Sequence, residues 1–329
     1  MITYFHRNLN AGFSINKVSQ TIISCIDDKQ EYYMPKNGAS FRDIITNIIY
    51  TFRHRNKHGI NHVTGDVHYV ILALIGCKSI LTIHDTVSLD YRNVCLFKKK
   101  ILEWLWFRIP LKFATKVVCI SEQTKLCIEK YTNRTDIVVI HNAVDSSFKK
   151  HIKEPTDNPI NILLIGTNPN KNIDRTLEAL KSFNCHLTII GKLSIAQEDF
   201  LKTNHFSYLV KSGLTDEEII AEYIKSDIVS FISLFEGFGM IVIEANMVGR
   251  PVICSEIPVL KEVAGDAALF VNPTNIESIK KGFKLLFEDS SYRTQLVQKG
   301  FENVKRFDAN IIRQKWILLY NTVSVQKWY

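Results

Sequence analysis

The chain has 329 residues, of which 46% are hydrophobic and 22% charged, so it is long enough for two globular domains and too apolar to be disordered. Its longest apolar run, Tyr69–Cys77, is too short to cross a bilayer, and its amino terminus does not have the charged-then-apolar order of a signal peptide. Seven scattered cysteines without a Cys-x-x-Cys pair indicate neither a zinc site nor a disulfide framework, which favours a reducing cytoplasm.

The net charge of +8 is concentrated in the first half of the chain. Residues 1–150 contain 21 Lys and Arg against 12 Asp and Glu, whereas residues 151–329 contain 20 against 21. A basic first half suggests an anionic partner, such as a membrane surface, a phosphorylated acceptor or nucleic acid, although it also serves solubility. Because the chain has no recognisable nucleic-acid-binding motif, we expect no nucleic-acid partner.

Apolar, β-branched runs alternate with longer amphipathic segments along the whole chain, which predicts parallel sheets covered by helices on both faces. In chain order, the predicted strands are Ile22–Ile26, Val67–Ile75, Ser79–Ile83, Lys116–Ile120, Ile137–Ile140, Ile160–Ile165, His186–Ile190, Phe206–Leu209, Ile228–Ile232, Pro251–Cys254 and Ala268–Val271. The predicted helices are Leu96–Phe113, Gln123–Tyr131, Ile173–Phe183, Asp216–Lys225, Met240–Val248, Ile276–Glu288 and Tyr292–Val304.

The polar residues 149–159, which include two prolines, form the best candidate linker. They separate two series of strands, so we predict an α/β chain of two doubly wound domains, residues 1–152 and 153–308. A final segment, residues 309–329, follows the second domain. In such domains a ligand binds at the carboxyl ends of the strands.

Three segments in the first half contain candidate site residues. Gly12 lies in a loop before a helix, where a simple turn would explain it equally well. His84 and Asp85 follow a predicted strand, where the imidazole could orient a hydroxyl or pass a proton, although Asp85 could also serve only as a helix cap. Residues 62–69 hold two His, an Asp and a Tyr, and metal binding there is conceivable from composition.

A basic and aromatic helix is predicted at residues 98–108, where three lysines precede two tryptophans and a phenylalanine at helical spacing. Such a helix can lie on an anionic membrane surface. A helix that packs against the core and exposes its lysines to solvent explains the pattern at least as well.

In the second half, two glycine-containing turns follow predicted strands. Gly166 begins the first, and Lys171, five residues later, can reach a diphosphate as a point charge. The second reads Glu236-Gly237-Phe238-Gly239, and Met240 then opens a helix that carries Glu244. Free backbone N–H groups and the positive end of a helix dipole make such a turn suitable for phosphate or hydroxyl groups, and a nearby carboxylate can bind a sugar hydroxyl.

The segment from Ser233 to Pro273 resembles the donor-site signature of the retaining glycosyltransferases of family 4, the glycosyl transferases group 1. That signature runs Ser, two variable residues, Glu-Gly-Phe-Gly, a helix with a second Glu, then Gly-x-Pro-Val-Ile and Glu-Val-x-Gly-Asp-Ala-Ala, and the sequence follows it almost throughout. Two positions elsewhere depart from the family's pattern. Thr167 stands where the family commonly has Arg, and Ala143 replaces the Gly of Asn-Gly-Val-Asp.

The resemblance implies the GT-B fold, in which two Rossmann-like, doubly wound parallel-sheet domains face each other across a cleft. It also implies that the final helix, in residues 309–329, crosses back to the first domain, and that residues 62–69 form an acceptor-side loop. It implies that Glu236 contacts the hydroxyls of the donor sugar, that Glu244 contacts the nucleotide ribose, and that His84 and Asp85 lie near the donor sugar and the acceptor. The expected catalytic residues are therefore His84, Asp85 and Glu236, and the expected donor-binding residues are Gly12, Gly166, Lys171, Gly237, Phe238, Gly239, Met240 and Glu244.

The function that the resemblance implies is transfer of a hexosyl unit, with retention, from a nucleotide-diphosphate sugar to a glycan or lipid-linked saccharide. Work on a cell-surface polysaccharide, such as lipopolysaccharide O-antigen or capsule, fits the family. No metal or cofactor is expected, and the enzyme is expected in the cytoplasm, with peripheral binding to the inner face of the plasma membrane as a further hypothesis. The alternatives are a nucleotide-sugar epimerase or hydrolase of the same fold, and a non-catalytic sugar-nucleotide-binding module.

Overall fold

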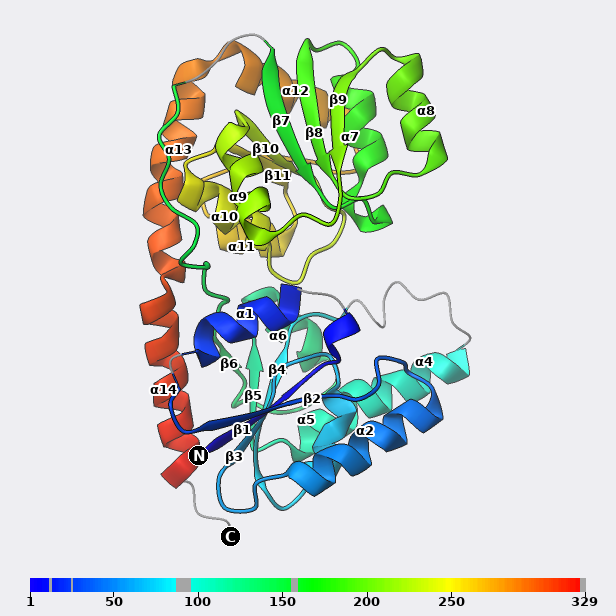
Figure 1. The fold of residues 1–329 in the computed structure, drawn as a ribbon, viewed down its shortest axis with the longest axis vertical. Coiled ribbons are helices and arrows are strands. Elements are labelled where there is room, and N and C mark those ends of the chain that lie inside the picture. Colours follow the sequence, from blue (N-terminus) through cyan, green and yellow to red (C-terminus); the bar gives the residue numbers. More distant parts are fainter. Residues whose placement is uncertain (12–13, 25, 87–95, 155–158, 326–329) are drawn as a thin grey trace. The chain divides into compact units, whose positions relative to one another are not determined.

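The structure, a computed structural model, describes residues 1–11, 14–24, 26–86, 96–154 and 159–325 (Figure 1). Gly12, one of the predicted donor-binding residues, lies outside these ranges. The chain divides into two units, the first made of Met1–Ala143 with Asp308–Tyr329 and the second of Val144–Phe307. The sequence analysis placed these limits at residues 152 and 308.

The first unit is built on a six-stranded parallel sheet with the strand order β2-β1-β3-β4-β5-β6. The inner strands are short apolar runs that are buried along nearly their whole length, as expected for a sheet covered on both faces. The strands are β1 (Ile2–His6), β2 (Lys29–Tyr33), β3 (Ile60–Val63), β4 (Lys78–Ile83), β5 (Lys116–Cys119) and β6 (Val138–Val139).

Helices cover both faces of this sheet (Figure 1), and a separate apolar core lies on each face. One core contains side chains of α2 (Phe41–His54), the 3-10 helix η2 (His68–Leu74), the π-helical segment η3 (Trp104–Arg108), α5 (Ile109–Phe113) and α6 (Glu122–Glu129). Helix α4 (Leu96–Glu103) leads directly into η3. The other core contains side chains of α1 (Ser14–Ile23) and α14 (Ala309–Val325). A 3-10 turn, η1 (Leu9–Ala11), follows β1.

Two predicted strands of this unit are wrong. Ile22 and Ile23 are the buried end of α1 rather than a strand, and most of Val67–Ile75 is η2. A fully buried apolar run of this length has no periodicity that separates a strand from a helix. The strands β1, β3 and the polar edge strand β2 were not predicted from the sequence.

The last helix explains why the chain returns to the first unit. Trp316 and Tyr320 of α14 are buried in the core beneath β1 and β3. The Tyr320 hydroxyl lies 2.9 Å from Nδ1 of His62 on β3 and accepts a hydrogen bond from the Tyr4 hydroxyl of β1 at 3.1 Å. Helix α14 is therefore fixed to the first sheet by both apolar packing and buried hydrogen bonds.

The second unit is also a six-stranded parallel sheet, with the order β12-β11-β10-β7-β8-β9. The strands are β7 (Ile160–Ile165), β8 (Cys185–Ile190), β9 (Ser207–Lys211), β10 (Ile228–Phe231), β11 (Val252–Ser255) and β12 (Leu269–Val271). The helices are η4 (Pro169–Lys171), α7 (Ile173–Leu180), α8 (Ile195–Thr203), α9 (Asp216–Lys225), α10 (Met240–Val248), α11 (Pro258–Ala264), α12 (Ile276–Glu288), α13 (Ser290–Val304) and η5 (Lys305–Phe307).

Local sequence signals are strong in this unit. The bounds of β7, α9, α10 and α12 are those predicted. Ser194 and Thr215 begin α8 and α9 with capping boxes, in which the hydroxyl accepts from the third helical N–H and that residue's side chain accepts from the cap's own N–H. The two sheets confirm the predicted fold class of two Rossmann-like doubly wound units. Within the described ranges, no helix is both long and apolar enough to cross a membrane.

Candidate active site

The strand order of the second unit reverses between β7 and β10, which are neighbours in the sheet although two strands and four helices separate them in sequence. Loops that follow strands on either side of such a point diverge and leave room for a ligand at the carboxyl edge. Here the two loops are also tied together. The Leu234 N–H donates to the carbonyl of Asn170 at 2.7 Å, and the Asn170 amide donates to the carbonyl of Phe235 at 3.3 Å.

Lys171, from the loop after β7, and Glu236, from the loop after β10, form an ion pair with 2.6 Å between Nζ and Oε1. The ammonium also lies 4.7 Å from the centre of the Phe231 ring. Both side chains of the pair are mostly buried, with 19% and 14% of their surface exposed. The structure thus brings together the predicted phosphate-binding cation and the predicted sugar-binding carboxylate.

Gly166 provides the space through which the Lys171 side chain runs. Its φ is +87°, and a Cβ at this position would lie 3.1 Å from Cε and 3.2 Å from Cγ of Lys171. Both the backbone conformation and the close approach favour glycine. Gly166 therefore acts by placing Lys171.

The turn at residues 236–239 presents its backbone at the amino end of α10. Gly239 is the N-cap of that helix, with φ +116°, and a Cβ there would lie 2.6 Å from a methyl carbon of Leu260. Phe238 is buried, and its ring packs edge-on against Phe307 with 5.7 Å between centroids. Since its ring serves the core, Phe238 can contact a ligand through its backbone only. Gly237 precedes Phe238 in this turn, and Met240 begins the helix.

Glu244 lies on α10, five residues beyond the N-cap Gly239, and its carboxylate accepts a hydrogen bond from the Tyr223 hydroxyl at 2.7 Å. Tyr223 is on α9 and is fully buried. Burial, with the neighbouring carboxylate, raises the pKa of Tyr223 well above its usual value, so the phenol remains a donor. Tyr223 is a positioning residue that the sequence analysis missed, because it reads as an ordinary apolar position of an amphipathic helix.

Thr167, at the position where Arg is common in the family, has a structural use. Its hydroxyl accepts from the Lys192 N–H at 3.1 Å and so ties the loop after β7 to the loop after β8. The neighbouring Gly191 gives it room, since a Cβ there would be 2.6 Å from Cγ2 of Thr167. The exposed side chain of Lys192 lies on this second loop.

In the first unit, His84 follows β4 and is buried. Its Nε2 lies 2.7 Å from the carbonyl oxygen of Thr64, so Nε2 carries the proton and Nδ1 is the acceptor. Burial lowers the pKa of His84 to about 4, which keeps the ring neutral near pH 7. Asp85 is half-buried and lies beside it.

His84 and Asp85 line a polar pocket of about 120 Å³ at the carboxyl edge of the first sheet, together with Lys36, Asp66, His68 and Trp106. His68 is almost fully buried, and its Nδ1 donates to the carbonyl of Trp106 at 2.8 Å. The lone pair of its Nε2 has no partner within the described residues. Burial lowers the pKa of His68, so this nitrogen can accept a hydrogen bond from a hydroxyl group.

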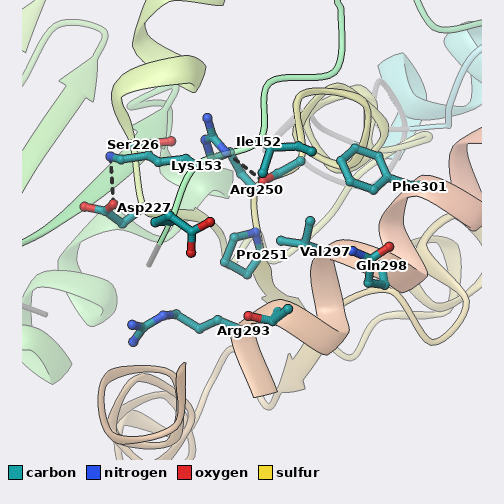
Figure 2. A pocket seen from close by; sticks show the side chains of 13 residues that line it. Ile152, Lys153, Ser226, Asp227, Arg250, Pro251, Arg293, Val297, Gln298 and Phe301 are labelled. Atoms are coloured by element: carbon teal, nitrogen blue, oxygen red, sulfur yellow. Dashed lines mark hydrogen bonds and ion pairs between the residues drawn. The ribbon is translucent and has the colours of Figure 1, made fainter. Parts of the chain in front are cut away.

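A second pocket, of about 260 Å³, lies in the second unit (Figure 2). It is at the amino edge of the second sheet, whereas Lys171 and Glu236 are at the carboxyl edge. Most of its charged groups have protein partners. Arg250 is buried and donates to the carbonyls of Tyr223, Ile224, His151 and Gly249, and Lys153 pairs with Asp227 at 2.7 Å. This pocket is a structural junction that fixes the carboxyl end of α9. Across the ranges that the structure describes, no three His, Cys, Asp or Glu side chains are grouped as metal ligands.

Fold and site together define a class: a two-unit, doubly wound protein of the GT-B fold with a charged turn at the switch point of its second sheet. Family comparisons give the same result with more detail. Residues 145–303 match the family described as glycosyl transferases group 1, and residues 30–148 match glycosyltransferase family 4. The chain belongs to the group 1 glycosyltransferases.

Among similar proteins, an uncharacterized glycosyltransferase of Methanocaldococcus jannaschii is 25% identical over 70% of this chain and 66% of its own length. The O-antigen chain mannosyltransferase RfbU of Salmonella typhimurium is 27% identical over 77% of this chain and 74% of its own. The solved structure of Anabaena HepE with UDP and glucose covers 98% of this chain and 100% of its own, at 14% identity and a TM-score of 0.79. The matched regions span 66% of the Methanocaldococcus protein and 74% of RfbU.

Proposed function

We propose that this glycosyltransferase moves a hexosyl unit from a nucleotide-diphosphate sugar to a saccharide or lipid-linked saccharide, with retention of anomeric configuration. The observation that carries the proposal is the pairing of Lys171 with Glu236 at the switch point of the second sheet, beside the amino end of α10. A cation, a carboxylate and the amino end of a helix at one point suit a ligand that has both a diphosphate and hydroxyl groups.

Each group has a distinct part in this proposal. Lys171 and the backbone N–H groups of Gly237, Phe238 and Gly239 stabilise the negative charge that develops on the departing diphosphate. Glu236 accepts hydrogen bonds from the donor sugar. Glu244, held by Tyr223, accepts from the ribose hydroxyls. Positive charge from the chain itself takes the place of a metal ion at the diphosphate.

In the reaction, the bond from the anomeric carbon to the phosphate oxygen breaks and a bond from the same carbon to an acceptor oxygen forms. The acceptor proton goes to the departing phosphate oxygen, so no covalent intermediate with Glu236 is required. Retention demands that the acceptor attack from the face that the diphosphate leaves. We assign the acceptor to the pocket of the first unit, where His84, Asp85 and His68 can hold its hydroxyl groups.

The names of the relatives support a biological setting. RfbU is an O-antigen chain mannosyltransferase, and another relative, 27% identical over 40% of this chain, transfers N-acetylgalactosamine to a diphospho-undecaprenol saccharide. We propose that this chain acts in the synthesis of a cell-surface polysaccharide, such as O-antigen or capsule. HepE binds UDP and glucose in its solved structure, which supports a nucleotide-sugar donor.

A panel of UDP-, GDP- and other nucleotide sugars, tested by thermal unfolding, checks this proposal. A ligand at 100 times its Kd stabilises the folded state by about 2.7 kcal/mol, so at least one donor should raise Tm by several degrees. The corresponding free sugar should leave Tm unchanged. If no nucleotide sugar raises Tm, the proposed donor site is wrong. If the stabilising donor is turned over without any acceptor, the protein is an epimerase or hydrolase.

A further inference from the structure

Helix α2 carries a stripe of large apolar side chains on its outer side. Phe41, Ile45, Ile49 and Phe52 are 78%, 39%, 46% and 54% exposed. Spacings of four, four and three residues place all four on one side of a helix. Contiguous exposed apolar surface of this kind is uncommon on monomeric soluble proteins and marks an interaction site.

The stripe lies on a different side of α2 from the side chains that the helix packs against the rest of the unit. Ile44, Asn47 and Thr51 lie on its inner side, where Ile44 joins the core and the Asn47 amide donates to the Tyr69 hydroxyl at 2.8 Å. Packing against the sheet is therefore complete without the stripe. Something outside this unit must explain four more exposed apolar side chains.

Basic side chains border the stripe. Residues 41–58 contain four Arg and Lys but one carboxylate, Asp43. Arg42 and Arg53 are exposed, and the guanidinium of Arg55 lies 3.5 Å from the centre of the Phe52 ring. An apolar stripe with cations at its border is the pattern of a helix that lies in the plane of an anionic lipid surface.

The segment from α4 to α5 repeats this combination. Ile101, Trp104 and Phe113 are exposed on it, and so are four cations, Lys99, Lys100, Arg108 and Lys112. This segment and α2 pack on the same core on one face of the first sheet, with η2 in contact with both (Figure 1). Their outer sides therefore belong to one helical layer, in which the apolar groups and the cations are interspersed.

We propose that this outer face of the first unit, formed by α2 and the α4–α5 segment, docks on an anionic lipid bilayer. The inference goes beyond the donor site, since no residue of that site takes part. Charge selects the occupant: eight cations and two carboxylates in residues 41–58 and 99–113 complement anionic headgroups, and the apolar side chains enter the headgroup and acyl boundary. The apolar stripe of α2 is the larger contribution, whereas the sequence analysis pointed to residues 98–108.

Sedimentation of the full chain with vesicles tests this proposal. We expect binding to equimolar phosphatidylcholine and phosphatidylglycerol, loss of that binding at high salt, and little binding to phosphatidylcholine alone. Ile49→Asp should weaken binding to the anionic vesicles by about tenfold or more, since it removes apolar contact and adds repulsion. Replacing Arg42 and Arg53 together by Gln should weaken it by about fivefold for each charge.

Leu318→Asp is the matched control, because Leu318 is 69% exposed on α14, over the opposite face of the same sheet. It should bind vesicles like the wild type. Thermal stabilisation by a nucleotide sugar should be the same in all variants, which separates this proposal from the donor site. Absence of salt-sensitive binding to anionic vesicles would overturn the proposal. So would an Ile49→Asp variant that binds vesicles normally but has changed from dimer to monomer by light scattering, since a second copy would then cover the face.

Discussion

Individual residues of the donor site depend on backbone geometry as much as on their own chemistry. Lys171 can reach Glu236 only because Gly166 has no side chain in its path and adopts φ +87°. Tyr223 likewise fixes Glu244 from a different helix. The two carboxylates that the sequence analysis singled out are therefore each held by a partner, one by a cation and one by a phenol.

Replacing Gly166 by Ala tests this dependence. We expect a loss of about 1–2 kcal/mol of stability from the left-handed conformation, together with weaker nucleotide-sugar binding because Lys171 must move. Gly213→Ala is the matched control, since Gly213 has φ +69° but nothing within 4 Å of the added Cβ. Urea unfolding and calorimetry would measure both. Equal effects of the two variants on binding would show that Gly166 does not serve Lys171.

At the scale of elements, buried histidines join the first sheet to its last helix. His6 on β1, His62 on β3 and His84 after β4 are all buried, and His62 bonds to Tyr320 of α14 and to Thr82 of β4. Burial lowers their pKa values to about 4, 3 and 4. All three rings are neutral in the folded chain near pH 7.

This network makes the first unit sensitive to acid. The unfolded chain takes up protons on these histidines near pH 6.5, whereas the folded chain does not until about pH 4. The contribution of these histidines to the free energy of unfolding is therefore complete above pH 6.5. It decreases as the pH is lowered, by at most roughly 2 kcal/mol per histidine between pH 7 and pH 5. Tm measured across this range should decrease, and His62→Gln should flatten the decrease. A Tm that is constant from pH 7 to pH 5 would contradict the burial of these rings.

Over the whole molecule, sequence patterns located the second unit better than the first. The glycine-rich turns, capping boxes and β-branched runs of residues 160–304 specify their elements locally, so β7, α9, α10 and α12 have the predicted bounds. In the first unit, residues 67–75 are apolar throughout and fold as η2, because packing on the sheet decides between strand and helix there. Tyr223 and His68 could not be assigned from sequence, since their roles come from contacts between distant segments.

The central claim is that the turn at the switch point of the second sheet binds the donor through Glu236 and Glu244. Calorimetric titration of the stabilising nucleotide sugar into the wild type, Glu244→Gln and Glu236→Ala, with turnover measured on the same samples, tests it directly. We predict that Glu244→Gln weakens binding by about tenfold through the ribose, and that Glu236→Ala reduces turnover more than binding. If both variants bind and turn over the donor like the wild type, the site is wrongly assigned.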